Sequence, residues 1–215
     1  MERTSVLLTL IILLSAIVEI WAKAQGRDRL VYVFKPLTTL LILGLALVSS
    51  PPPTPFYRWA VVLGLLLSTA GDIFLMLPDD RFLQGLGSFL MGHLAYIAAF
   101  TVGRNAFPRL LLLLPWVLYG LLIFSLLRAY FGRMLLPATV YLVIILAMAW
   151  SALSAWATQP FTGTLLALAG AVLFVVSDSA LAWRRFRHKF RGADVVVMAT
   201  YYAAQWLIAL SVGVK

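Results

Sequence analysis

The feature that most constrains the fold is a regular alternation of long apolar segments and short polar connections. A helix needs ~20 mostly apolar residues to cross a bilayer. Eight segments meet this requirement, at residues 4–22, 31–50, 57–77, 84–103, 110–128, 134–156, 164–183 and 194–213. Proline, glycine and charged residues mark the connections, as expected where helices end. We therefore predict an all-α polytopic membrane protein, an eight-transmembrane-helix bundle forming one integral membrane domain over residues 1–215.

The composition agrees with this prediction and excludes several classes of site. Of the 215 residues, 63% are hydrophobic and 12% are charged, whereas soluble domains average about 45–50% and about 25%. The chain has no cysteine, which excludes disulfides, thiolate metal sites and a cysteine nucleophile. The net charge of +9 is expected from basic loops beside membrane spans, so we predict no nucleic-acid partner.

The distribution of basic residues predicts the orientation. Twelve of the 17 Lys and Arg residues lie in or beside the connections that follow the first, third, fifth and seventh segments. Because positive loops stay in the cytoplasm, we expect both termini outside it, in a bacterial inner membrane. Residues 1–24 also resemble a signal peptide that ends in Ala-Lys-Ala, but the long apolar stretch and Glu19 favour a retained span.

Three carboxylates lie inside or near apolar segments: Glu19, Asp72 and Asp178. With a rise of 1.5 Å per residue, Asp72 lies ~8 Å and Asp178 ~9 Å inside the cytoplasmic ends of their helices. A charge at this depth is costly unless it faces the bundle interior or a water-filled cavity. The common depth predicts that the two aspartates share one site.

The two halves of the sequence show weak internal similarity. The stretches LSTAGDIFLM and FVVSDSALAW each place a small residue before aspartate, in the third apolar segment of a four-segment half. The segments that follow are also similar, because Phe82 precedes His93 by the same spacing as Phe190 precedes Tyr201. This pattern suggests two four-helix repeats related by parallel duplication.

Other polar residues in the apolar segments could line the same cavity. His93 and Tyr96 are three residues apart and therefore share a helix face. Lys35 lies near the cytoplasmic start of the second segment, and Tyr141 and Tyr201 lie within the sixth and eighth. Each has a structural alternative: the lysine could snorkel, the tyrosines could pack or sit at the interface, and the histidine could be a core residue.

Two neighbouring carboxylates in a medium of low dielectric cannot both ionise cheaply, so one should be an acid and the other a base. This pair could catalyse hydrolysis by general acid–base chemistry, or it could carry protons in a transporter. The chain contains no GxSxG, HExxH or P-loop pattern. A metal site formed by Asp72, Asp178 and His93 is a further alternative. Another is that the protein is a structural or regulatory membrane subunit. We predict no metal and no cofactor.

Several short motifs occur in a fixed order: Lys35-Pro36, Gly71-Asp72 followed by Ile73-Phe74-Leu75-Met76, Gly92-His93 with Tyr96, and Ser177-Asp178 with Ala180. In this order and spacing the chain resembles the YhhN family of integral membrane proteins, over roughly residues 5–210. The characterised members of that family are lysoplasmalogenases.

The resemblance implies hydrolysis of the vinyl-ether bond of lysoplasmalogens to a fatty aldehyde and a glycerophospho-base. It implies that Asp72 and Asp178 are the catalytic pair, with a lysophospholipid substrate, membrane lipid around it and no obligate protein partner. We expect Lys35 to contact the substrate phosphate. The residues expected to orient water or the headgroup are His93, Tyr96, Tyr141 and Tyr201. A small proton-coupled transporter that uses the buried aspartates is the alternative.

Overall fold

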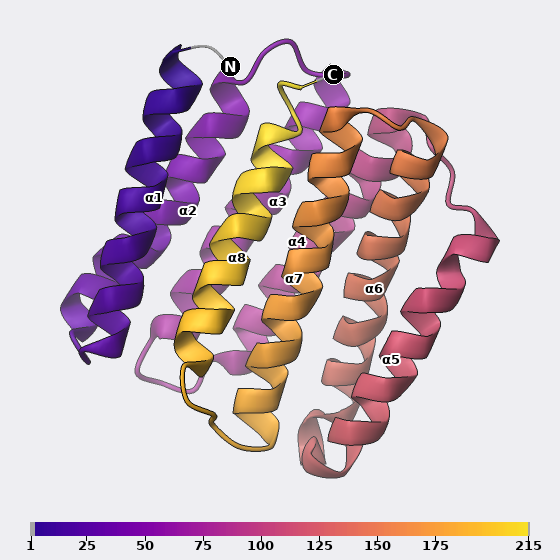
Figure 1. The fold of residues 1–215 in the computed structure, drawn as a ribbon. Helices are drawn as coiled ribbons and strands as arrows, with labels where there is room; N and C mark the ends of the chain where they lie inside the picture. Colours follow the sequence, from indigo (N-terminus) through magenta and orange to yellow (C-terminus); the bar gives the residue numbers. More distant parts are fainter. Residues whose placement is uncertain (1–2, 215) are drawn as a thin grey trace.

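A computed structural model describes residues 3–214, which form eight long α-helices joined by short loops (Figure 1). The helices are α1 (Arg3–Ala24), α2 (Asp28–Val48), α3 (Pro55–Met76), α4 (Phe82–Thr101), α5 (Leu114–Leu127), α6 (Leu135–Thr158), α7 (Thr162–Phe186) and α8 (Ala193–Leu210). Short 3-10 turns extend α4 and flank α5: η1 (Val102–Arg104), η2 (Leu110–Leu113), η3 (Arg128–Tyr130) and η4 (Gly132–Met134). The described residues contain no strand, so the all-α prediction is confirmed.

All eight predicted segments correspond to a helix that is long and apolar enough to cross a membrane. The largest difference concerns the fifth segment, which reaches this length only as η2, α5 and η3 together, over Leu110–Tyr130. The prediction of eight spans is therefore confirmed. The proposed relation between the two four-helix halves stays a prediction.

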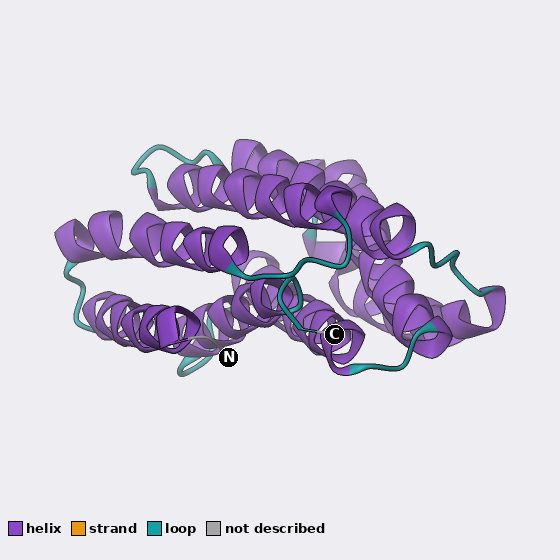
Figure 2. Cartoon of the chain, turned by 90° about the horizontal axis from the view of Figure 1, so that it is seen from above, coloured by secondary structure: helices purple, strands orange, loops and turns teal. Residues whose placement is uncertain are grey.

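The helices run side by side, with α1 and α5 at opposite edges of the bundle (Figures 1 and 2). At one edge α1 packs against α2 and α8, and at the other α5 packs against α6 and α7. Leu127 is the one fully buried residue of α5 within the described chain, and many of the helix's leucines, such as Leu118 and Leu121, are exposed. Such an apolar exterior suits contact with lipid, which is as apolar as the side chains themselves.

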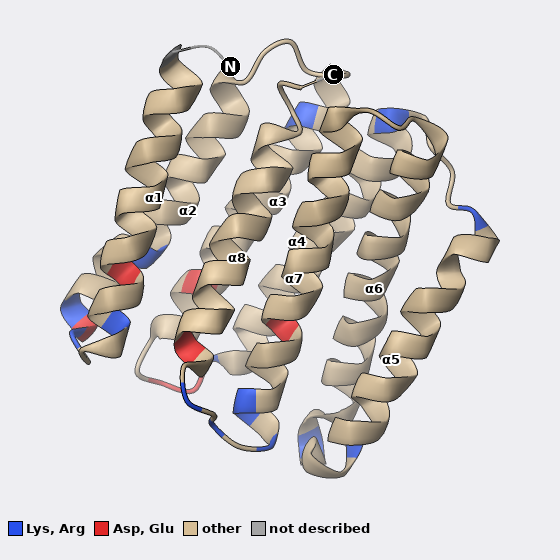
Figure 3. Ribbon diagram, viewed as in Figure 1, with Lys and Arg blue, Asp and Glu red and all other residues tan. Residues whose placement is uncertain are grey.

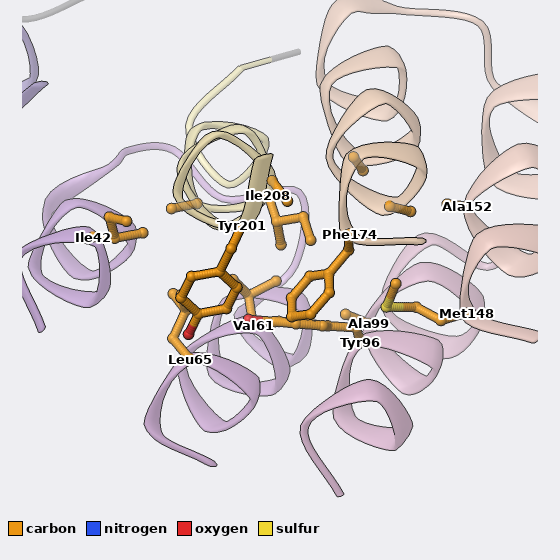
Figure 4. Packing of buried hydrophobic residues seen from close by; sticks show 14 of the residues in the cluster. Ile42, Val61, Leu65, Tyr96, Ala99, Met148, Ala152, Phe174, Tyr201 and Ile208 are labelled. Carbon is orange, nitrogen blue, oxygen red and sulfur yellow. The ribbon is translucent and has the colours of Figure 1, made fainter. Parts of the chain in front are cut away.

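Aromatic rings fill the centre of the bundle (Figure 4). The ring of Phe174 lies 5.5 Å from that of Tyr201 and 4.7 Å from that of His93, measured between centroids. Phe89 contacts both Phe174 and Tyr201, at 6.4 and 5.8 Å. These rings from α4, α7 and α8 form a continuous packed group, here called the aromatic cluster (Phe89, His93, Phe174 and Tyr201). Two members of the cluster contact buried carboxylates: Tyr201 is hydrogen-bonded to Asp72, and His93 lies near Asp178.

A glycine allows α7 and α8 to approach closely. A Cβ atom on Gly170 would lie 2.7 Å from the side chain of Ile208 and 2.8 Å from the backbone oxygen of Ala204. Small residues at helix contacts are the usual means of close packing between helices in membranes.

We expect Gly170→Ala to lower the free energy of unfolding by about 1–3 kcal/mol, because the added methyl group overpacks this contact. Thermal unfolding in detergent measures the effect. Gly44→Ala is the matched control, since a Cβ there meets nothing within 4 Å, and it should leave the melting temperature unchanged or raise it. Equal melting temperatures for the two variants would contradict the close approach of α7 and α8.

Charged residues gather toward one end of the bundle, where the loops after α1, α3, α5 and α7 lie (Figure 3). At the other end Arg104, expected in a polar loop, is instead buried, with 4% of its surface exposed. Its Nη2 donates to the backbone oxygen of Ser211 at 3.0 Å, and its guanidinium lies 4.2 Å from the ring centroid of Tyr57. Arg104 therefore ties η1 to the end of α8.

Candidate functional site

Asp72 lies on the buried face of α3 and its side chain is 2% exposed. Its Oδ2 accepts hydrogen bonds from Thr39 Oγ1 at 2.8 Å and from the Tyr201 hydroxyl at 2.7 Å. The ammonium of Lys35 lies 3.4 Å from its Oδ1. Two hydroxyl donors and one cation, supplied by α2 and α8, suit a carboxylate anion at this position.

Asp178 lies on α7 in a different set of contacts. Its Oδ2 accepts a short hydrogen bond from the Tyr141 hydroxyl of α6. His93 Nε2, from α4, lies 2.9 Å from that hydroxyl and 3.6 Å from Asp178 Oδ2. The histidine is buried and its Nδ1 has no hydrogen-bond partner in residues 3–214. Asp178, Tyr141 and His93 thus form one connected polar group inside the bundle.

Rings of the aromatic cluster link the partners of the two carboxylates. Tyr201 is hydrogen-bonded to Asp72, His93 is beside Asp178, and Phe174 contacts the rings of both. In the described chain no hydrogen bond joins the carboxylates directly, and each has its own donors. Their different surroundings distinguish the two groups chemically.

Both aspartates line the same polar cavity, which has a volume of about 570 Å³. Its inner wall includes Lys35, Tyr201 and Ser177, and its outer part is formed by charged residues of the loops after α3 and α7. The cavity therefore connects the buried carboxylates with the charged end of the bundle. Both side chains therefore reach one common space, and the shared catalytic site stays a prediction.

A smaller apolar cavity of about 60 Å³ adjoins the polar one. Most of its lining comes from α4, α5, α6 and α7, for example Leu127 and Ile145, and the rest is Leu75 of α3 and Phe131 between η3 and η4. Asp178 and Phe89 line both cavities. Asp178 is consequently placed where a polar compartment meets an apolar one.

Ion pairs hold the charged loops at the mouth of the polar cavity. Arg185 Nη2 lies 2.6 Å from Asp80 Oδ2, which joins the end of α7 to the loop after α3. The hydrogen bond from Arg185 lowers the pKa of the exposed Asp80 carboxyl. Arg184 and Lys189 both pair with Asp194 in the first turn of α8, where an acidic side chain favours the helix start.

Of the other predicted site residues, four lie beside an aspartate and one does not. Tyr141, Tyr201 and Lys35 contact an aspartate directly, and His93 reaches Asp178 beside Tyr141. Tyr96 does not join them: its hydroxyl donates to Gln205 Oε1 at 2.6 Å, and it lines neither cavity.

The sequence prediction did not include Thr39. It follows Lys35 by four residues, which places both on one face of α2, and this spacing is the signal that identifies it. Residues 3–214 bring no three His, Asp or Glu side chains close enough to one another to hold a metal ion.

Comparison with known proteins places these residues in a family. The sequence pattern described as the YhhN family matches residues 30–212. The chain belongs to the YhhN family. The resemblance seen in the sequence motifs is therefore confirmed, and the matched range contains both aspartates and all of their contacts described above.

Relatives within the family carry two kinds of name. The "Uncharacterized membrane protein YhhN" of Escherichia coli O6:H1 is 29% identical over 198 residues, covering 92% of this chain and 94% of the relative. The human "Lysoplasmalogenase TMEM86B" is 32% identical over 192 residues, covering 89% and 79%. The protein of that name from Sus scrofa is 39% identical over 154 residues, covering 69% and 61%. No solved structure matches the chain. Like these YhhN relatives, the protein is an integral membrane protein.

Proposed function

We propose that this protein is a membrane-embedded lysoplasmalogenase that hydrolyses the vinyl-ether bond of a lysophospholipid to a fatty aldehyde and a glycerophospho-base. The position of Asp178 on both a polar and an apolar cavity carries the proposal. A lysoplasmalogen has one polar headgroup and one apolar chain, and its vinyl ether lies between them. Relatives named lysoplasmalogenase support the same conclusion.

In this proposal the headgroup occupies the polar cavity and the chain enters the apolar one. Only the first carbons of the chain fit within about 60 Å³. The remainder would continue past Ile123 and Leu127 of α5, the helix with the least buried surface, toward the lipid. The vinyl ether then lies beside Asp178.

The first chemical step is protonation of the alkene carbon by the carboxylic acid of Asp178. The transfer leaves an Asp178 carboxylate and an oxocarbenium ion. Asp72, held as an anion by Lys35, Thr39 and Tyr201, would stabilise this cation electrostatically. The place of Asp178 at the cavity junction supports its proposed role as the acid, and the cationic and hydroxyl partners of Asp72 support its proposed role as the base.

The second step is addition of water to the oxocarbenium ion. Asp72 accepts a proton from this water, which gives a neutral hemiacetal. On collapse, Asp72 returns that proton to the departing glycerol oxygen, while Asp178 accepts the hemiacetal hydroxyl proton. Aldehyde and alcohol are released, and both carboxyl groups regain their starting protonation states.

The charge distribution also bears on the orientation of the protein in the membrane. We propose that the charged end of the bundle faces the cytoplasm, with both termini on the opposite side of a bacterial inner membrane. The polar cavity would then open toward the cytoplasm. Lys35, although paired with Asp72, remains the candidate for contact with the substrate phosphate deep in that cavity.

Purified protein in detergent provides the test. We expect release of fatty aldehyde from a defined lysoplasmalogen and none from the matched alkyl-ether lysolipid, which has no alkene carbon to protonate. Folded protein that releases no aldehyde from ethanolamine or choline lysoplasmalogens would contradict the proposal. Substrate flux in sealed vesicles would then favour the proton-coupled transporter. The names of the relatives do not support that alternative.

We expect Tyr141→Phe to lower kcat about tenfold, because Asp178 loses a hydrogen bond to a charged or reacting group. Aldehyde release under saturating substrate measures the effect. The matched control is Tyr119→Phe. The Tyr119 hydroxyl is hydrogen-bonded at 2.8 Å to Ser179, which lies on α7 like Asp178, and it bonds neither aspartate. Equal rates in the Tyr141 variant and the wild type would remove Tyr141 from the proposed site.

A further inference from the structure

Glu19 is a buried carboxylate that the proposed reaction does not use. It lies on α1 with 1% of its surface exposed, and it lines the polar cavity that contains both aspartates. Its Oε2 has no hydrogen-bond partner within residues 3–214. An unpaired buried carboxylate is costly in a membrane protein, and such residues usually mark a ligand or ion pathway.

A cation lies on the same face of the same helix. Lys23 follows Glu19 by four residues, so the two side chains are neighbours on α1. Lys23 also lines the polar cavity, and it forms no ion pair in the part of the chain that the structure describes. This wall of the cavity therefore presents one carboxyl group and one amino group, one helical turn apart, and neither has an ion-pair partner among the described residues.

The order of groups across the bundle matches the order of groups along a lysophospholipid. The apolar cavity lies on the side of α5 and α6, and Asp178 on α7 stands between it and the polar cavity. Lys35 and Asp72 come next, on α2 and α3, and Glu19 lies on α1 at the opposite edge from α5 (Figure 1). A lysophospholipid has its groups in the same order: the apolar chain, the vinyl ether, the phosphate and the terminal amine. A lipid bound in this direction has its amine at α1.

We propose that Glu19 binds the primary ammonium of a phosphoethanolamine headgroup, whose phosphate faces Lys23 and Lys35. This inference rests on the proposed function and specifies its substrate class. A primary ammonium has N–H donors that can reach the free Oε2 of Glu19. The quaternary ammonium of choline has none and is typically bound by aromatic faces. The cavity lining from α1 and α2 consists of Glu19, Lys23, Val31 and Lys35, without an aromatic ring.

The test compares kcat/KM for three lysoplasmalogens: one with ethanolamine, one with choline, and an alkenyl-glycerophosphate without an amine. We expect the wild type to prefer the ethanolamine lipid. Glu19→Gln should lower kcat/KM for that lipid about tenfold, since a charge-assisted hydrogen bond is lost, and should change the amine-free lipid by less than about twofold. The ratio between the two lipids is the readout, because general loss of folded enzyme does not alter it.

Two controls separate amine recognition from other effects of charge. Asp28→Asn removes an exposed carboxylate outside the cavity and should leave the ratio unchanged. Lys23→Gln should lower kcat/KM for all three lipids alike, because all three carry the phosphate. If Glu19→Gln does not fold, Glu19→Asp keeps the charge, withdraws the carboxylate by one methylene, and should still reduce the preference for ethanolamine.

Three results would overturn the inference. An equal fall for all three lipids in the Glu19 variant, or a wild type without headgroup preference, would remove Glu19 as an amine site and leave the hydrolase intact. Absence of aldehyde from every lipid with the wild type would overturn the proposed function, and this inference with it.

Discussion

Replacing Asp178 with asparagine is expected to lower kcat by a factor of about 10²–10⁴, the usual contribution of a general acid. Asparagine cannot donate a proton to carbon, yet its carbonyl oxygen can still accept the Tyr141 hydroxyl hydrogen bond. The Asp178 side chain is 13% exposed to the cavity, so the amide group remains partly solvated. The variant should therefore fold with a melting temperature near that of the wild type.

Aldehyde release and thermal unfolding in detergent together measure this prediction. Asp79→Asn is the matched control, because it makes the same substitution at an exposed position at the cavity mouth. We expect the control to retain wild-type kcat. Full activity in Asp178→Asn would show that the proton comes from another group.

Asp72→Asn is expected to lose both activity and stability. The base for water is removed, which should lower kcat by a factor of about 10² or more. In addition, the variant leaves Lys35, whose side chain is only 12% exposed, without its partner. Loss of one member of a buried ion pair costs about 3 kcal/mol or more, so the melting temperature should fall well below that of Asp178→Asn.

A double variant separates the two effects. Asp72→Asn combined with Lys35→Met removes both charges, and it should recover most of the lost stability because no unpaired ion remains. Its activity should stay at the level of Asp72→Asn alone. Stability that is unchanged in Asp72→Asn, or activity restored in the double variant, would contradict the roles given to this pair.

Much of the fold follows from the sequence because the bilayer allows few alternatives. Backbone groups in lipid must bond within their own helix, so each apolar run of about 20 residues becomes one span. The same constraint identifies the site in outline. Asp72 and Asp178 lie at a similar depth, and a carboxylate in a span must face the interior or a cavity. The structure places both on the wall of one polar cavity.

The pairing of side chains within the bundle does not follow from the sequence, because it depends on how each helix is rotated and which helices are neighbours. Lys35 could have turned to the interface, but the rotation of α2 brings it and Thr39 onto Asp72. Tyr96 shares a helix with His93, yet it faces Gln205 of α8 instead of Asp178. The position of Glu19 in the cavity likewise depends on the packing of α1 against α2 and α8.

Hydrolysis in D₂O tests the central claim most directly. If a carboxylic acid protonates the alkene carbon, wild-type protein should release an aldehyde that carries one deuterium on the carbon next to the carbonyl. Turnover should also be slower than in H₂O, and authentic aldehyde incubated without substrate controls for exchange. Absence of aldehyde, or an aldehyde without deuterium at that carbon, would contradict proton transfer from the aspartate site to the vinyl ether.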